Sequence, residues 1–197
     1  KTAGLINVTK KNILFNNDVA SLDFIIGDNI RYKFEYYIDK GYYWSIGVKS
    51  RFNKFEKGVN YDLISDDTTN PELNRIDIEV SDFTNQLYIQ TVLREEFVFG
   101  IGAEHKRLKV TSETISPSGQ DKTIFEKSDF LSTFGFLKLD TYNNKYFPSD
   151  GLFFSGDFHW YLYSSDFTND FDLFSLAKAK IGYATPIVGD LSVNITS

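Results

Sequence analysis

The chain has 197 residues and carries 21 basic against 27 acidic side chains, for a net charge of −6. A chain of this length makes one domain or one piece of a larger one. It contains no basic block suited to a phosphate backbone, so nucleic acid is not expected as a partner. Cysteine is absent and histidine occurs only twice, which excludes disulfide frameworks and Cys/His zinc sites.

Aromatic residues make up 17% of the chain. A helical membrane protein would need a run of about 20 apolar residues, and the sequence has none. The aromatic content therefore has to be explained without transmembrane helices. Methionine is absent as well. We therefore expect a mature product or an internal fragment, and we favour the fragment.

Apolar and polar residues alternate with a period of two along most of the chain, which predicts β-strands and no competing helix. The clearest case is Ile30–Tyr36, where all charges fall on one parity and all apolar residues on the other. In chain order, strands are expected over 3–9, 20–28, 30–39, 43–55, 75–94, 96–110, 128–142, 151–164, 171–185 and 190–197. The apolar parity changes inside 75–94, which implies either a bulge near Asp82 or a turn at Thr84-Asn85.

The connections between these strands fall into two classes. Residues 27–29, 39–41 and 188–190 read as tight turns, whereas Glu56 to Asn74 and Ser112 to Lys127 read as long, exposed polar loops. No linker or internal repeat divides the chain. We therefore expect residues 1–197 to form a single continuous sheet.

Strand length and charge favour a membrane barrel. Many of the strands span roughly 10 to 15 residues, against about 5 or 6 in soluble sheets and about 9 to 11 for a tilted membrane strand. A sheet that spans lipid must close, with an apolar exterior and an interior that can be polar. The side chains expected to face such a lumen are Arg31, Lys33, Glu35, Lys49, Arg51, Asp77, Glu79, Glu104, Lys106, Lys138, Asp140, Lys178 and Lys180.

The alternative is a soluble lipocalin-like binding barrel with its apolar side inward. Aromatic residues that cluster near strand ends, as in Tyr42-Tyr43-Trp44 and Tyr146-Phe147, favour interfacial girdles over a soluble core. A porin-like channel with a charged lumen is a second alternative in function.

The segment from Leu139 to Gly151 carries the most specific pattern. It is a strand end followed by a Pro-Ser-Asp-Gly turn, in which proline presets φ and glycine accepts a positive φ. The residues that carry the pattern are Asp140, Asn143, Phe147, Pro148 and Gly151. This pattern resembles the signature of the bacterial surface antigen superfamily, whose barrels assemble outer-membrane proteins or move polypeptides across the outer membrane.

The resemblance covers essentially the whole chain, because Asn7–Phe15 is similar to the family's early turn and Tyr183–Ile187 to a later strand end. It implies an all-β fold: an incomplete antiparallel transmembrane β-barrel, with about ten strands of a larger barrel. It also implies the outer membrane of a Gram-negative bacterium as location, outer-membrane lipid as a partner, and a role as anchor or translocator.

Within the superfamily, the spacing in Phe34–Trp44 and Ser81–Leu87 is most similar to the C-terminal barrels of outer-membrane patatin-like phospholipases. The resemblance implies a passenger domain or polypeptide substrate. In such proteins a hydrolase precedes the barrel, and no Gly-x-Ser-x-Gly elbow occurs here, so this segment is not expected to be an enzyme.

The sharpest catalytic grouping in the sequence is Ser155, Asp157 and His159, which share one parity. Residues two apart on a strand stand about 7 Å apart, which is too far for a direct proton relay. We therefore expect polar lumen residues here, with no catalytic residue, cofactor or metal. His105 has the opposite parity and is expected at the headgroup level.

Overall fold

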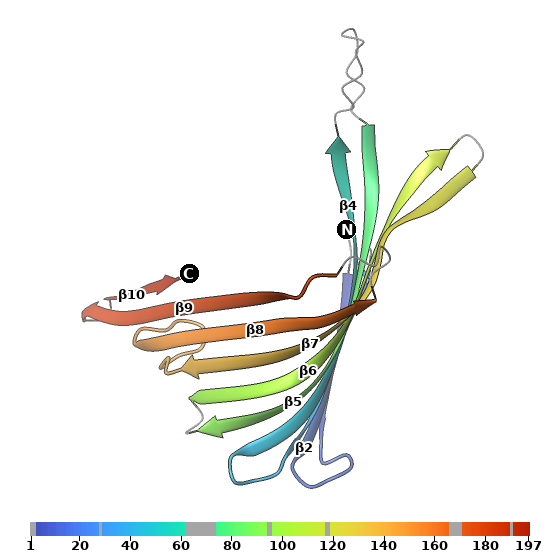
Figure 1. Ribbon diagram of the computed structural model, residues 1–197. Helices are drawn as coiled ribbons and strands as arrows, with labels where there is room; N and C mark the ends of the chain where they lie inside the picture. The colour runs from blue at the N-terminus through green and yellow to red at the C-terminus, as the bar shows by residue number, and fades with distance from the viewer. Residues whose placement is uncertain are drawn as a thin grey trace.

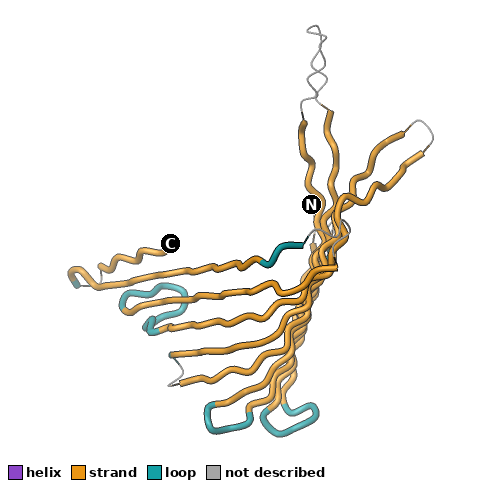
Figure 2. Tube along the Cα trace, viewed as in Figure 1, coloured by secondary structure: helices purple, strands orange, loops and turns teal. Residues whose placement is uncertain are grey.

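The computed structural model describes residues 3–27, 29–61, 74–93, 96–116, 119–165, 171–189 and 191–197. Within these ranges the chain forms ten strands and no helix (Figures 1 and 2). The strands are β1 (Ala3–Lys11), β2 (Asp18–Gly27), β3 (Arg31–Asp39), β4 (Trp44–Tyr61), β5 (Asn74–Leu93), β6 (Phe97–Ser116), β7 (Gly119–Asp140), β8 (Gly151–Ser165), β9 (Phe174–Val188) and β10 (Leu191–Thr196).

All ten strands belong to one antiparallel sheet in which every strand pairs with its neighbours in sequence. β1 and β10 lie at the two edges of the sheet, which is open. The strands fan from a steep orientation around β2 to a nearly horizontal one at β8 and β9 (Figure 1), as expected from the twist of β-sheets. The all-β fold and the open antiparallel sheet confirm the fold expected from the alternation.

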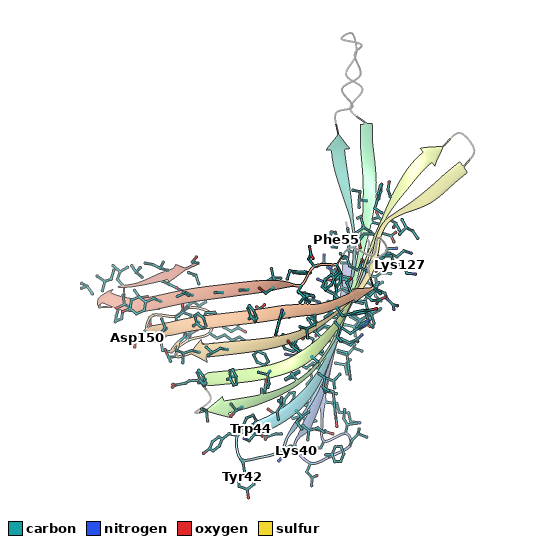
Figure 3. The ribbon with its side chains drawn as sticks, in the orientation of Figure 1. Lys40, Tyr42, Trp44, Phe55, Lys127 and Asp150 are labelled. Carbon is teal, nitrogen blue, oxygen red and sulfur yellow. The ribbon has the colours of Figure 1, made fainter. Side chains whose placement is uncertain are left out.

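The meander gives the sheet two rims. The turns after β1, β3, β5, β7 and β9 lie at one end of the strands, which we call the short-turn rim. Figure 3 shows Lys40, Tyr42 and Trp44 toward this rim, and Phe55 and Lys127 toward the opposite end.

The described parts of the two long loops expected from the sequence are strand. β4 and β5 continue to Tyr61 and from Asn74, and β6 and β7 continue to Ser116 and from Gly119. These hairpins project beyond the other strands (Figure 1). Polar sequence does not prevent a two-stranded extension, because the backbone hydrogen bonds of a hairpin do not depend on the side chains. Residues 62–73 and 117–118 of the expected loops lie outside the described residues.

The expected bulge near Asp82 and the expected turn at Thr84-Asn85 are both wrong. β5 is continuous, and its pairing with β4 and β6 passes through Asp82 without a shift in register. Shifts in register occur instead at Val110/Thr111 and Leu131/Ser132 and in the last hairpin. Apart from the extended hairpins, the strand boundaries agree with the expected ones to within a few residues.

Candidate functional site

One face of the sheet carries a dense array of charged side chains, and we call it the charged face. Register places these side chains in rows: Glu35 pairs with Lys49, and Lys49 with Gln86, which in turn pairs with Glu104. The residues of the expected lumen set that share this face are Arg31, Lys33, Glu35, Lys49, Arg51, Glu104, Lys106, Lys138, Asp140, Lys178 and Lys180.

Glu79 does not share the charged face, and the side chain of Asp77 lies outside the described residues. On β5 the charged face holds the even-numbered positions, and Glu79 pairs in register with Glu56 on the other side of the sheet. The carboxylate of Glu79 lies 3.0 Å from Lys54 Nζ. Because β5 runs straight through Asp82, the polar side of the strand changes face at that residue, and counting parity along the sequence placed Glu79 on the wrong face.

Ion pairs and hydrogen bonds connect neighbouring strands on the charged face. Glu35 lies 3.2 Å from Lys49 Nζ and accepts a 2.9 Å hydrogen bond from the hydroxyl of Tyr88, which is only 3% exposed. Asp82 lies 3.8 Å from Arg51 and 3.6 Å from Lys106. Tyr88 and Asp82 were not in the expected set, and only the cross-strand register brings them to these partners.

A continuous row of ring contacts crosses the charged face from β5 to β9, and we call it the aromatic band. Tyr88 meets Phe136 edge-on at 6.1 Å, and Phe136 stacks with Phe134 at the same centroid separation. The imidazole of His159 stacks on Phe134 at 5.3 Å and on Tyr161 at 6.3 Å. The last stack joins Tyr161 to Phe174 at 4.5 Å.

Glycines make room for the aromatic band. A Cβ atom added at Gly47 would collide with the ring of Tyr88, and one added at Gly100 would collide with Phe136. At Gly102 an added Cβ would lie 2.7 Å from the ring of Phe134. The glycines therefore allow large rings to lie flat across the neighbouring strand.

His159 is the polar member of the aromatic band. Its Nδ1 atom lies 3.3 Å from Glu104 Oε1, and its Nε2 atom lies 3.4 Å from Asp157 Oδ2. The Glu104 side chain is 5% exposed and accepts a 2.6 Å hydrogen bond from Gln86. The structure thus brings Asp157 and His159 closer than backbone spacing predicts, because the side chains lean toward each other.

In the part of the chain that the structure describes, no hydrogen bond joins Ser155 to His159 or Asp157. Nor is any group of three or more His, Asp or Glu side chains within the described ranges arranged to hold a metal ion.

The signature turn between β7 and β8 is built around two asparagines. Asn143 Oδ1 accepts hydrogen bonds from the backbone amides of Ser149 and Asp150, at 3.0 and 3.2 Å. Asn144 Oδ1 accepts from the amides of Tyr146 and Phe147, at 2.9 and 3.0 Å. Side-chain oxygens that bind nearby amides in this way stabilise a turn without regular secondary structure.

The end of this turn requires a glycine. Gly151 has φ of +118°, and a Cβ atom there would collide with the carbonyl oxygen of Thr141. Pro148 is buried, whereas Phe147 is 85% exposed at the short-turn rim. Asp140 lies on the charged face and pairs with Lys138 at 3.1 Å.

Tyr142 connects the signature turn to the charged face. Its ring stacks on Phe153 at 5.9 Å, and its hydroxyl occupies the space where a side chain at Gly182 would lie. A Cβ atom added at Gly182 would also lie 3.0 Å from the methyl group of Thr196 on β10. Tyr142 therefore packs over β8 and β9 at the short-turn rim.

Asp18 organises the turn between β1 and β2 and was missed in the sequence. Its fully buried carboxylate accepts hydrogen bonds from the amides of Ile13, Leu14 and Phe15, at 2.7 to 2.9 Å, and from the Tyr36 hydroxyl at 2.8 Å. These four donors offset the cost of burying the charged carboxylate. An aspartate at the first position of a strand, directly after Asn16-Asn17, is the signal that could have identified it.

The opposite face of the sheet is apolar, and we call it the apolar face. Many of its large side chains are more than a third exposed: Ile6, Val8, Leu22, Phe34, Ile46, Val48, Leu87, Ile89, Phe99, Ile101, Phe158, Trp160, Ile181 and Tyr183. A soluble protein does not leave such a continuous apolar surface open to water.

Polar groups end the apolar face toward the long hairpins. On β6 the apolar positions run from Phe97 to Ala103, and His105 and Arg107 follow on the same face. The side chains of both contact Asp129, at 3.1 and 2.7 Å. His105 therefore lies where the apolar surface gives way to charge. His105 is in the middle of β6, not near a strand end, because the strand continues to Ser116.

At the short-turn rim, aromatic side chains are highly exposed. Tyr42 and Tyr43 are 92% and 68% exposed, and Tyr146 is 78% exposed. Lys145 lies over the ring of Tyr146 at 5.7 Å. Aromatic rings and lysines at one level are the pattern found where membrane strands meet the headgroups.

Comparison with known proteins decides the family. The family model of the OMP85 superfamily matches residues 1–197. The chain belongs to the OMP85 superfamily. No curated protein and no solved structure is significantly similar to it.

Members of the OMP85 superfamily are outer-membrane proteins of Gram-negative bacteria, so membership supports the outer-membrane barrel expected from the two-faced strands. In the described residues, no helix has the length and apolar character to cross a membrane.

Proposed function

We propose that this chain is the membrane-embedded part of an outer-membrane protein, and that it anchors and helps translocate a polypeptide joined to it. The finer proposal is that it serves as the barrel of a patatin-like phospholipase. A single observation carries the role: one continuous ten-stranded sheet with an apolar face and a charged face.

The apolar face supports lipid as the partner. Moving one large apolar side chain out of water is favourable by about 1.5 to 3 kcal/mol. Ile89, Ile101 and Phe158, at 38%, 54% and 50% exposure, lie in one row of this face, with Gly135 between Ile101 and Phe158. Acyl chains would cover them without requiring directed contacts, which is why we assign the apolar face to outer-membrane lipid.

The charged face supports a hydrated interior. Ion pairs such as Lys49–Glu35 are partly exposed, and such pairs contribute little to stability in water. Instead, these pairs keep the charged face hydrated, and because their opposite charges cancel they add no net electric field. An extended polypeptide, which carries both polar and apolar side chains, would find complementary groups on the charged face and in the aromatic band.

A channel for small solutes is the second candidate. The observation that favours it is an excess of cations near β9, where Lys178 and Lys180 have no acidic partner within 4 Å among the described residues. Unpaired lumen charge selects ions in channels.

The test uses the full-length protein that contains this chain, expressed in a Gram-negative host. External protease is added to intact cells, and the part of the protein outside the barrel is followed with an antibody. Cleavage in intact cells supports translocation. Cleavage only after the outer membrane is opened refutes translocation and leaves an anchor. Stable single-channel conductance in planar bilayers, with no surface exposure, would favour the channel instead.

A further inference from the structure

Lys138, Ser155 and Lys180 lie in one row on three neighbouring strands of the charged face. Register pairs Ser155 on β8 with Lys138 on β7 and with Lys180 on β9. The Cβ atoms of directly paired residues are about 4.5 to 5.5 Å apart. The serine hydroxyl therefore lies between the stems of two lysines.

The two lysines converge on a single ring. Lys138 Nζ is 5.7 Å and Lys180 Nζ is 5.8 Å from the ring centroid of Phe153, which precedes Ser155 by two residues on the same face. Two ammonium groups repel each other, and exposed stems of this length could swing apart. The aromatic ring attracts both cations and so keeps them on either side of the serine.

The positive charge of this cluster is only partly neutralised. Lys138 pairs with Asp140 at 3.1 Å, but the two side chains are 47% and 36% exposed, so the pair is weak and can open. Lys180 has no acidic partner within 4 Å among the described residues, and the same holds for Lys178 in the adjacent row. In a chain of net charge −6, this is a local excess of cations.

We propose that Lys138, Ser155 and Lys180 form a binding site for an oxyanion of the phosphate class, which the ammonium groups and the serine hydroxyl hold away from the face of the Phe153 ring. Each ammonium group offers three donors and the serine offers a hydroxyl donor, while phosphate oxygens only need to accept. Phosphate would replace Asp140 as the partner of Lys138. Because the apolar face is assigned to lipid, the site takes a soluble phosphate compound, and a lipid headgroup is the competing source.

The test is calorimetric titration of inorganic phosphate into the full-length protein, purified in neutral detergent at low salt. We expect saturable binding that weakens as sodium chloride is added. Lys180→Gln should weaken it by about tenfold or more, because a charge-assisted hydrogen bond is lost. Lys180→Arg should retain binding within a few-fold, and Ser155→Ala should cost less than Lys180→Gln.

Lys54→Gln is the matched control. Lys54 is also a partly exposed lysine, but it lies on the other face and pairs with Glu79 at 3.0 Å. It should leave phosphate binding unchanged. A gel shift on boiling, retained by every variant, shows that the barrel is still folded.

Absence of saturable binding in the folded wild-type protein would overturn the proposal. Equal losses in Lys180→Gln and Lys54→Gln would also overturn it, since they would show general electrostatic attraction. Nanodiscs containing phosphatidylglycerol provide the second arm. If phosphatidylglycerol but not inorganic phosphate engages Lys180, the ligand is a headgroup and the soluble-phosphate assignment is wrong. These readouts do not depend on surface exposure of a passenger, so the site can fail while the translocation role stands.

Discussion

The free-energy cost of placing an arginine on the folded sheet should depend on which face carries it and on its depth in the bilayer. Ile89 and Gln90 are consecutive residues of β5 on opposite faces. Ile89 is 38% exposed and pairs in register with Ile46 and Ile101, while Gln90 pairs with Ser45 and Gly100. The apolar positions of β5 run from Leu87 to Leu93, bounded by Asn85, so Ile89 lies near the middle of the apolar face.

An arginine near the bilayer midplane costs about 2 to 4 kcal/mol in an outer-membrane barrel, and about 0 to 1 kcal/mol near the interfaces. We therefore expect Ile89→Arg to lower the folding equilibrium constant about 30- to 800-fold, since about 1.4 kcal/mol is a factor of ten. Leu93→Arg, at the end of the same face, should cost about 0 to 1 kcal/mol. Gln90→Arg should be mild because its face is polar.

The assay is urea titration of the full-length protein folded into vesicles, with the folded fraction read from unboiled gels. The decisive comparison is Ile89 against Leu93, because a soluble core would also reject an arginine at Ile89 but would show no dependence on bilayer depth. Equal costs at Ile89 and Gln90, or a cost at Leu93 as large as that at Ile89, would refute the assignment of the apolar face to lipid.

Three further predictions concern single contacts. Asp18→Asn should destabilise the protein by about 1 to 3 kcal/mol in a urea titration, because an amide keeps only one of the two acceptor oxygens and leaves at least one buried donor without a partner; an unchanged urea midpoint would contradict the role given to this carboxylate. Gly182→Val should cost about 1 to 3 kcal/mol in a urea titration, because it displaces Tyr142, and Tyr142→Ala in the same chain should recover part of that loss; a fully additive pair would contradict the packing described. Tyr88→Phe should cost about 1 to 2 kcal/mol by the same titration, through the lost hydrogen bond to Glu35, and a neutral result would show that this bond adds nothing.

The sequence was sufficient for the fold because one signal dominates it. Alternation such as that of Ile30–Tyr36 fixes both the strand and its two faces, and the structure has a strand and a charged face there. The alternation was insufficient where two strands extend beyond the rest of the sheet. Beyond Asp82 the polar parity of β5 is reversed, and no local signal separates a reversed face from a bulge, which is why Glu79 was misplaced.

The site depended on information that a single strand does not contain. The contact between His159 and Glu104 joins β8 to β6 across β7, so it is set by the register of three strands together and by a shift at Leu131/Ser132. The aromatic band has the same origin. By contrast, the signature turn is local: Pro148 and Gly151 could be assigned their turn from the sequence because their backbone requirements are intrinsic to the residues.

The central claim is that the two-faced sheet is part of a closed barrel in the outer membrane. The most direct test is heat-modifiable migration: the full-length protein is extracted from membranes in mild detergent and run on a denaturing gel with and without boiling. The account predicts that the unboiled protein comes from the membrane fraction and migrates at a different apparent mass from the boiled protein. Identical migration in both lanes, with the protein in the soluble fraction, would contradict it.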